Sequence, residues 1–152
     1  MAYPNIFEPS TTRNLIERID KLTPASQRLW GKMGVAEMLA HCSVPYQQLL
    51  GERHDKTPIF MKWIVKTFFK SSMVNEVPFK RNLPTAPSFI IKEEKNFDEE
   101  KKRLQHYVQK VQEMGSAAME GREQVTIGKL SSLEWNNLLY KHLDHHLQQF
   151  GV

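Results

Sequence analysis

Hydrophobic side chains recur at helical spacing in four long segments of the chain. Apolar residues three and four positions apart lie on one face of an α-helix, whereas a half-buried strand alternates apolar and polar residues. The four segments follow the first pattern, and no convincing run follows the second. The sequence therefore predicts an all-α fold with long helices over residues 11–22, 34–50, 96–114 and 131–150.

Polar residues mark the starts of the last two predicted helices. Asn96 can accept a free backbone N–H as an N-cap, and Ser131 with Glu134 has the spacing of a capping box. Within the second helix, Pro45 lacks the N–H that would bond the carbonyl of His41. We therefore expect a kink directly beside His41.

The second and third helices are joined by a long connection of about 45 residues. It contains one further amphipathic helix, predicted over Ile59–Phe69, and then an irregular stretch with three prolines. Such a length suits a crossover rather than a tight turn. The sequence thus predicts a single domain over residues 1–152, built as a four-helix bundle with a long crossover between helices two and three.

The charges are mixed along the chain. Lysine and arginine number 21 against 17 aspartates and glutamates, giving a formal net charge of +4, and no block of like charges occurs. This pattern argues against a nucleic-acid partner. The lone Cys42 forms no intramolecular disulfide, the N-terminus lacks the features of a secretory signal, and no apolar window approaches a membrane span. We expect a cytoplasmic protein with no membrane contact.

The last helix carries three histidines close together. At about 100° per residue, His146 falls within the apolar stripe and His142 at its edge, whereas His145 falls at the border with the polar face. His142 and His146 are one turn apart, a spacing that lets two imidazoles bind one ion. The competing interpretation is two hydrogen-bonded core histidines, but two such groups on one apolar face both need partners.

A third ligand is expected on the second helix. His41 lies at the edge of that helix's apolar stripe, where a side chain lining a cavity would lie. Glu37, one turn earlier, is a candidate acceptor for an imidazole N–H, although a solvated charge in the first turn of the helix explains it better. Cys42 points about 100° away from His41, so we interpret it as a small core residue.

Other chemistries lack their motifs. The chain contains no phosphate-binding glycine loop and no G-x-S-x-G element, and the last helix lacks the Glu-x-x-His spacing of a di-iron bundle. The sequence therefore predicts a mononuclear site of His41, His142 and His146 with an open coordination position. Zinc, nickel, iron and copper all suit such a set of nitrogen ligands.

Two segments resemble a known superfamily. They are Trp30-x10-His41, with Met38-Leu39-Ala40 before the histidine, and His142-x-x-His145-His146-x-x-Gln149 after Gly128-Lys129-Leu130 and Glu134-Trp135. Both resemble the DinB-like (YfiT-like) metalloproteins, and KHLDHHLQQFG resembles the end of a DinB-related bacterial family of undefined function. The resemblance implies a four-helix bundle, often a homodimer, with a nickel, zinc or iron site at the three histidines. It also implies transferases, isomerases or hydrolases that use a low-molecular-weight thiol.

Two functional hypotheses follow. The first is a metal-dependent transferase or hydrolase of a small molecule, in which Glu37 or His145 moves a proton. The second is a non-catalytic bundle, dimeric, that uses the metal for stability or binds a small ligand.

Overall fold

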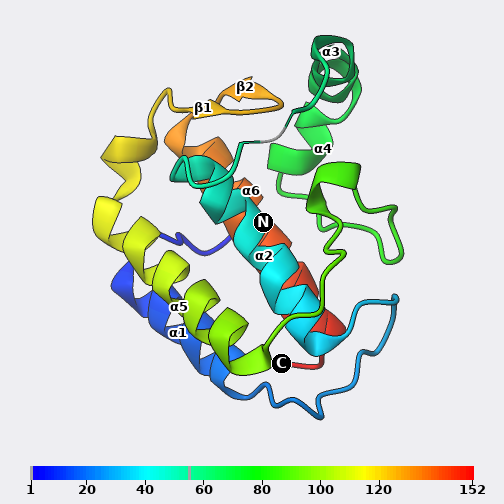
Figure 1. The fold of residues 1–152 in the computed structure, drawn as a ribbon. Coiled ribbons are helices and arrows are strands. Elements are labelled where there is room, and N and C mark those ends of the chain that lie inside the picture. Colours follow the sequence, from blue (N-terminus) through cyan, green and yellow to red (C-terminus); the bar gives the residue numbers. More distant parts are fainter. Residues whose placement is uncertain (1, 55) are drawn as a thin grey trace.

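The computed structural model describes residues 2–54 and 56–152 and is mostly helical (Figure 1). Six α-helices, two short 3-10 turns and one two-stranded sheet make up the regular structure of these residues. The α-helices are α1 (Pro9–Asp20), α2 (Val35–Leu49), α3 (Ile59–Phe68), α4 (Lys70–Val74), α5 (Phe97–Met114) and α6 (Ser132–Gln149). The 3-10 turns are η1 (Pro87–Phe89) and η2 (Ser116–Met119), and the strands are β1 (Glu123–Gln124) and β2 (Gly128–Lys129).

The core lies among the four longer helices. Helix α2 packs against α5 and α6, and α1 packs against the same two helices. Figure 1 shows α1 and α5 side by side, with α2 and α6 crossing the centre of the molecule. Each helix contributes an apolar stripe, as the spacing of its hydrophobic residues predicted. Fully buried members include Leu15 and Ile19 of α1, Met38 and Leu39 of α2, Leu104 and Val108 of α5, and Leu143 and Leu147 of α6.

The predicted helix ends are confirmed to within two residues. The Asn96 side chain accepts the Glu99 N–H at 3.1 Å. At the start of α6, the Ser131 hydroxyl accepts the Glu134 N–H at 3.2 Å while the Glu134 carboxylate accepts the Ser131 N–H at 2.8 Å. Helix α1 begins earlier than predicted because Pro9 fits the first helical turn, where its missing N–H has no intrahelical partner to lose.

The expectation of no strands is wrong in one place. Strands β1 and β2 pair antiparallel, with Glu123 opposite Lys129 and Gln124 opposite Gly128. The Gln124 carboxamide oxygen accepts the N–H groups of the two residues that close the turn, Thr126 and Ile127, at 2.7 and 2.9 Å. Two residues per strand are too few to show an alternating pattern in the sequence, so this hairpin could not be predicted.

The amphipathic helix predicted within the crossover is confirmed as α3. It stands away from the four longer helices in Figure 1, and none of its side chains is buried. Ile59 is 87% exposed and Trp63 61% exposed. No helix in the described ranges is both long and apolar enough to cross a membrane.

One buried cation ties the crossover to α6. Lys141 is only 1% exposed, and its ammonium group donates to the carbonyl oxygens of Ser72 and Asn75 at 2.8 Å and of Val77 at 3.2 Å. It also donates to the Asn75 side chain at 3.0 Å. Burial lowers the pKa of Lys141 to about 8. These bonds satisfy the carbonyls at the end of α4 and fix where the following segment begins.

Replacing Lys141 with methionine removes the donor that these oxygens share. We expect Lys141→Met to lower the free energy of unfolding by about 1–3 kcal/mol, as for other hydrogen bonds to a charged group. Urea unfolding followed by circular dichroism measures the change, with Lys92→Met at an exposed position as the matched control. Equal free energies of unfolding for the two variants would contradict the role of Lys141 in holding the crossover to α6.

Candidate metal centre

Three imidazoles meet where α2 and α6 pack together. His41 comes from α2, and His142 and His146 come from successive turns of α6. One nitrogen of each ring lies within 4.8 Å of the others, and the ring centroids are 4.6–4.9 Å apart. The structure thus brings together the three residues that the sequence pattern selected.

The closest approach is between His41 and His142, whose Nε2 atoms are 3.0 Å apart. Two imidazole nitrogens that share an ion at about 2.0–2.1 Å lie roughly 2.8–3.4 Å apart for bond angles of about 90–110°. The observed separation therefore fits two ligands of one ion. Without an ion, the same approach is a hydrogen bond in which one ring donates to the other.

Backbone and side-chain acceptors fix the tautomers of two of the rings. The Phe89 carbonyl accepts a hydrogen bond from His41 Nδ1 at 3.0 Å, so Nδ1 carries the proton and Nε2 keeps its lone pair. Gln149 plays the same part for His146, whose Nδ1 lies 2.8 Å from Gln149 Oε1. The Gln149 amide nitrogen donates to the Trp30 carbonyl at 2.8 Å, which leaves Oε1 as the acceptor. Both rings thereby turn Nε2 into the cluster, as ligating histidines do.

The loop before α2 holds Gln149 in this position. The Leu29 N–H donates to the Gln149 main-chain carbonyl at 2.7 Å, in addition to the bond between the Gln149 amide and Trp30. Gly31 has a φ of +78°, and a Cβ added there would collide with Nε2 of Gln149. The positive φ therefore favours glycine, and a larger residue here would push the Gln149 amide out of its present position.

Burial keeps the cluster uncharged. It is the main cause that lowers the pKa of each ring, to about 3 for His146 and well below the ordinary value for His142. For His41, burial likewise lowers the pKa, opposed by the bond to Phe89. Neutral imidazole is the form that binds a metal. No other metal-ligating side chain joins the three among the described residues.

The remaining sequence candidates lie elsewhere. The Glu37 carboxylate accepts the Gly34 N–H at 3.2 Å and caps α2. This contact agrees with the interpretation of Glu37 as a charge in the first turn of its helix, and the two nitrogens of His41 face Phe89 and His142 instead. Cys42 is buried, its S–H points to the Met38 sulfur at 3.6 Å, and burial raises its thiol pKa. Cys42 is thus a core residue, as interpreted.

His145 stands beside the cluster rather than in it. Its ring contacts His146, with centroids 5.2 Å apart, and packs edge-on against Trp30 and Phe79 at 5.9 and 5.8 Å. This position confirms that the helical wheel separated His145 from the two inward-facing histidines.

The groups that orient the rings were not predicted from the sequence. Phe89 could not be found because it lies in the irregular crossover, 48 residues from His41. Gln149 did carry a signal, since a residue three positions after His146 lies on the same helix face.

A comparison with protein families gives a match over residues 9–151, to the family described as "Protein of unknown function (DUF1569)". The chain belongs to the DUF1569 family. Comparisons with curated proteins and with solved structures gave no match.

Membership of the DinB-like superfamily, expected from two short motifs, is wrong for this DUF1569 protein: the family match covers nearly all of the chain and gives no link to that superfamily. The motifs misled because an upstream histidine plus a His-x3-His pair is what any three-histidine site on two helices produces. The homodimer and the use of a thiol came from the same resemblance and stay untested predictions.

The low pKa values predict how stability depends on pH. Histidines in the unfolded chain titrate near pH 6.5, whereas desolvation in the folded protein lowers the pKa of all three rings of the cluster. The unfolded state therefore binds more protons as the pH falls below about 6.5, and the metal-free protein loses stability.

Urea unfolding in the presence of a chelator, at about pH 7.5 and about pH 5.5, measures this loss above the range where most carboxylates titrate. We expect His146→Gln to show a smaller difference between the two pH values than the unaltered protein. His106→Gln, at an exposed position of α5, is expected to keep the full difference. An unchanged difference in His146→Gln would contradict the prediction.

Proposed function

We propose that this DUF1569 protein is a metal-dependent enzyme, a transferase or hydrolase of a small molecule, whose divalent ion is held by His41, His142 and His146. The observation that carries the proposal is the convergence of three neutral imidazoles, two of them with their tautomers fixed from outside. A core that only needed to be packed gains nothing from three polar rings that require partners.

Each residue around the cluster has a distinct task in this proposal. The three histidines bind through neutral nitrogens, so the ion keeps its full positive charge, and Phe89 and Gln149 hold two of the rings at the productive rotation. When bound, a divalent ion on three imidazoles lowers the pKa of a water to about 7 and activates a thiol similarly, which supplies a nucleophile at neutral pH. We propose zinc, nickel or iron as the ion, all of which suit imidazole ligands.

We further propose that α1, α2, α5 and α6 form one four-helix bundle domain with the long crossover between α2 and α5. Their mutual packing supports this arrangement, in which facing helices supply ligands to a site between them.

A non-catalytic role is the alternative, and one observation favours it. The Phe89 ring packs edge-on against both His41 and His142, at 5.7 and 5.9 Å, and so covers the cluster. A structural metal site is closed in this way, whereas a catalytic site keeps a position open. In the enzyme hypothesis, the segment around η1 must move to admit a substrate.

Metal content is the first test. We expect the protein purified without an affinity tag to hold about one equivalent of a divalent ion by mass spectrometry, and His142→Ala to hold less than about a tenth. His145→Ala is the matched control, because it removes the neighbouring imidazole that does not face the cluster. Metal-free protein, or equal metal in both variants, would overturn the proposed centre.

Turnover separates the enzyme from the structural alternative. The metal-loaded protein is screened for hydrolysis of small esters, amides and phosphoesters, and for the conjugation of small thiols to electrophiles. Activity that disappears both on chelation and in His142→Ala supports the enzyme. Bound metal that raises the melting temperature, with no turnover in either screen, supports the structural role.

The role of Gln149 gives a further prediction. Gln149→Met removes the acceptor that orients His146, and we expect the metal affinity to fall about 10–100-fold, as for other losses of such outer partners. Competition with a chelator measures the affinity. Gln148→Met, at the adjacent exposed position, is expected to leave it unchanged. Similar affinities for the two variants would show that Gln149 does not orient a ligand.

A further inference from the structure

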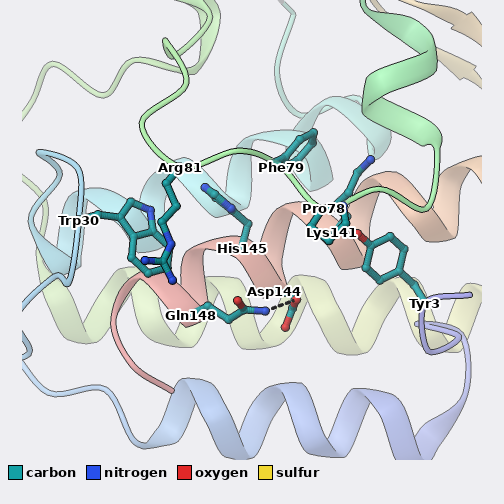
Figure 2. A pocket seen from close by; sticks show the side chains of 9 residues that line it. All are labelled: Tyr3, Trp30, Pro78, Phe79, Arg81, Lys141, Asp144, His145 and Gln148. Atoms are coloured by element: carbon teal, nitrogen blue, oxygen red, sulfur yellow. Dashed lines mark hydrogen bonds between the residues drawn. The ribbon is translucent and has the colours of Figure 1, made fainter. Parts of the chain in front are cut away.

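A small hollow lies beside the histidine cluster. Its volume is about 60 Å³, and its lining includes Tyr3, Trp30, Phe79, Arg81, Lys141 and His145. In Figure 2, Trp30 and Arg81 lie together on one side, Tyr3 and Lys141 lie on the other, and His145 projects between them. The lining thus comes from the N-terminus, the loop before α2, the crossover and α6.

The hollow and the cluster share residues. The His145 ring contacts the hollow's Trp30 and Phe79, and it also contacts the ring of the proposed ligand His146. Trp30 serves both places as well, because its carbonyl holds Gln149 while its indole lines the hollow. A molecule in the hollow therefore lies one imidazole ring away from the proposed metal centre.

The charge in the hollow is positive. The Arg81 guanidinium stacks over the Trp30 indole, 4.1 Å from the ring centroid, and no carboxylate pairs with it among the described residues. The Lys141 ammonium lies on the opposite side, with its protons committed to the crossover but its charge unneutralised. The one carboxylate in the lining, Asp144, is paired with Arg18 at 2.8 Å.

Two hydrogen-bonding groups in the lining are unused. The Tyr3 hydroxyl and the Trp30 indole N–H are both buried and have no partner in the described structure. An indole N–H only donates, and a phenol donates readily, so both call for an acceptor. A buried donor without an acceptor costs free energy, which a suitable ligand would recover.

We propose that this hollow binds a small oxyanion group, a carboxylate or phosphate, and that this group is the anionic end of the substrate handled at the three-histidine centre. The second part rests on the proposed function, whereas the first stands on the hollow alone. Arg81 supplies the charge, and Tyr3 and Trp30 supply neutral donors. A hollow of about 60 Å³ has room for a few waters, which suits the end group of a molecule and not a whole substrate.

The test is a titration followed by nuclear magnetic resonance at the indole N–H of Trp30, a resonance identified by its loss in Trp30→Phe. Acetate and inorganic phosphate are the two probes, and acetamide is the uncharged control of the same shape as acetate. We expect a saturable shift with at least one anion and none with acetamide. The anion that binds more tightly identifies the end group as a carboxylate or a phosphate.

Substitutions in the lining test whether the anion binds in this hollow. We expect Arg81→Gln to weaken anion binding at least about tenfold and Tyr3→Phe to weaken it by less, because a charged donor contributes more than a neutral one. Lys80→Gln removes a neighbouring exposed charge outside the lining and is the matched control. No saturable shift with either anion, or equal binding by Arg81→Gln and Lys80→Gln, would overturn the oxyanion site.

The two proposals fail separately. Metal content is measured on the same preparations, and the titration is repeated after chelation. Anion binding without any metal leaves the oxyanion site standing and removes its link to a metal centre. Metal without anion binding leaves the centre standing and overturns the oxyanion site.

Discussion

The hydrogen bond from Gln149 to the Trp30 carbonyl is the constraint on which the rest of the site depends. It forces the Gln149 oxygen toward His146 and so determines which ring nitrogen faces the cluster. It also joins the end of α6 to the loop before α2. These two helices supply the three histidines. The positive φ of Gly31 and its close approach to this amide both favour glycine at position 31, so a local backbone feature affects the position of a ring on another helix.

The crossover between α2 and α5 supplies the groups that surround the histidine cluster. Its Phe89 carbonyl fixes the His41 tautomer, while its Phe89 ring covers the cluster. The same segment supplies Arg81 and Phe79 to the neighbouring hollow and is anchored by the buried ammonium of Lys141. A buried cation is stabilised only where several oxygens converge on it, so the anchor holds the start of the segment in one place. The helices thus place the imidazoles, and the crossover sets their environment.

Sequence patterns predicted the parts of this molecule that depend on regular spacing. The helices and the separation of His145 from His142 and His146 follow from a period of 3.6 residues. The helix caps follow from polar residues at fixed positions before and within the first turn. The hairpin and the contact between Phe89 and His41 do not, since they depend on short or irregular segments far apart in the chain. Similarity of short motifs misled for a related reason. The motifs report the geometry of a three-histidine site, which unrelated helical proteins can share, whereas the family match covers residues 9–151.

The position of Trp30 bears on the choice between a catalytic and a structural centre. A metal used only for stability needs the Trp30 carbonyl, which holds Gln149, but makes no use of the unpaired indole N–H on the same residue. The Tyr3 hydroxyl and the Arg81 guanidinium lie around the same hollow, where each adds a donor. Arg81 forms no ion pair with the rest of the described chain. Burying the Tyr3 hydroxyl and the Trp30 indole N–H without an acceptor is unfavourable. Their position one ring away from His146 therefore favours a ligand beside the centre, and with it chemistry over stability alone.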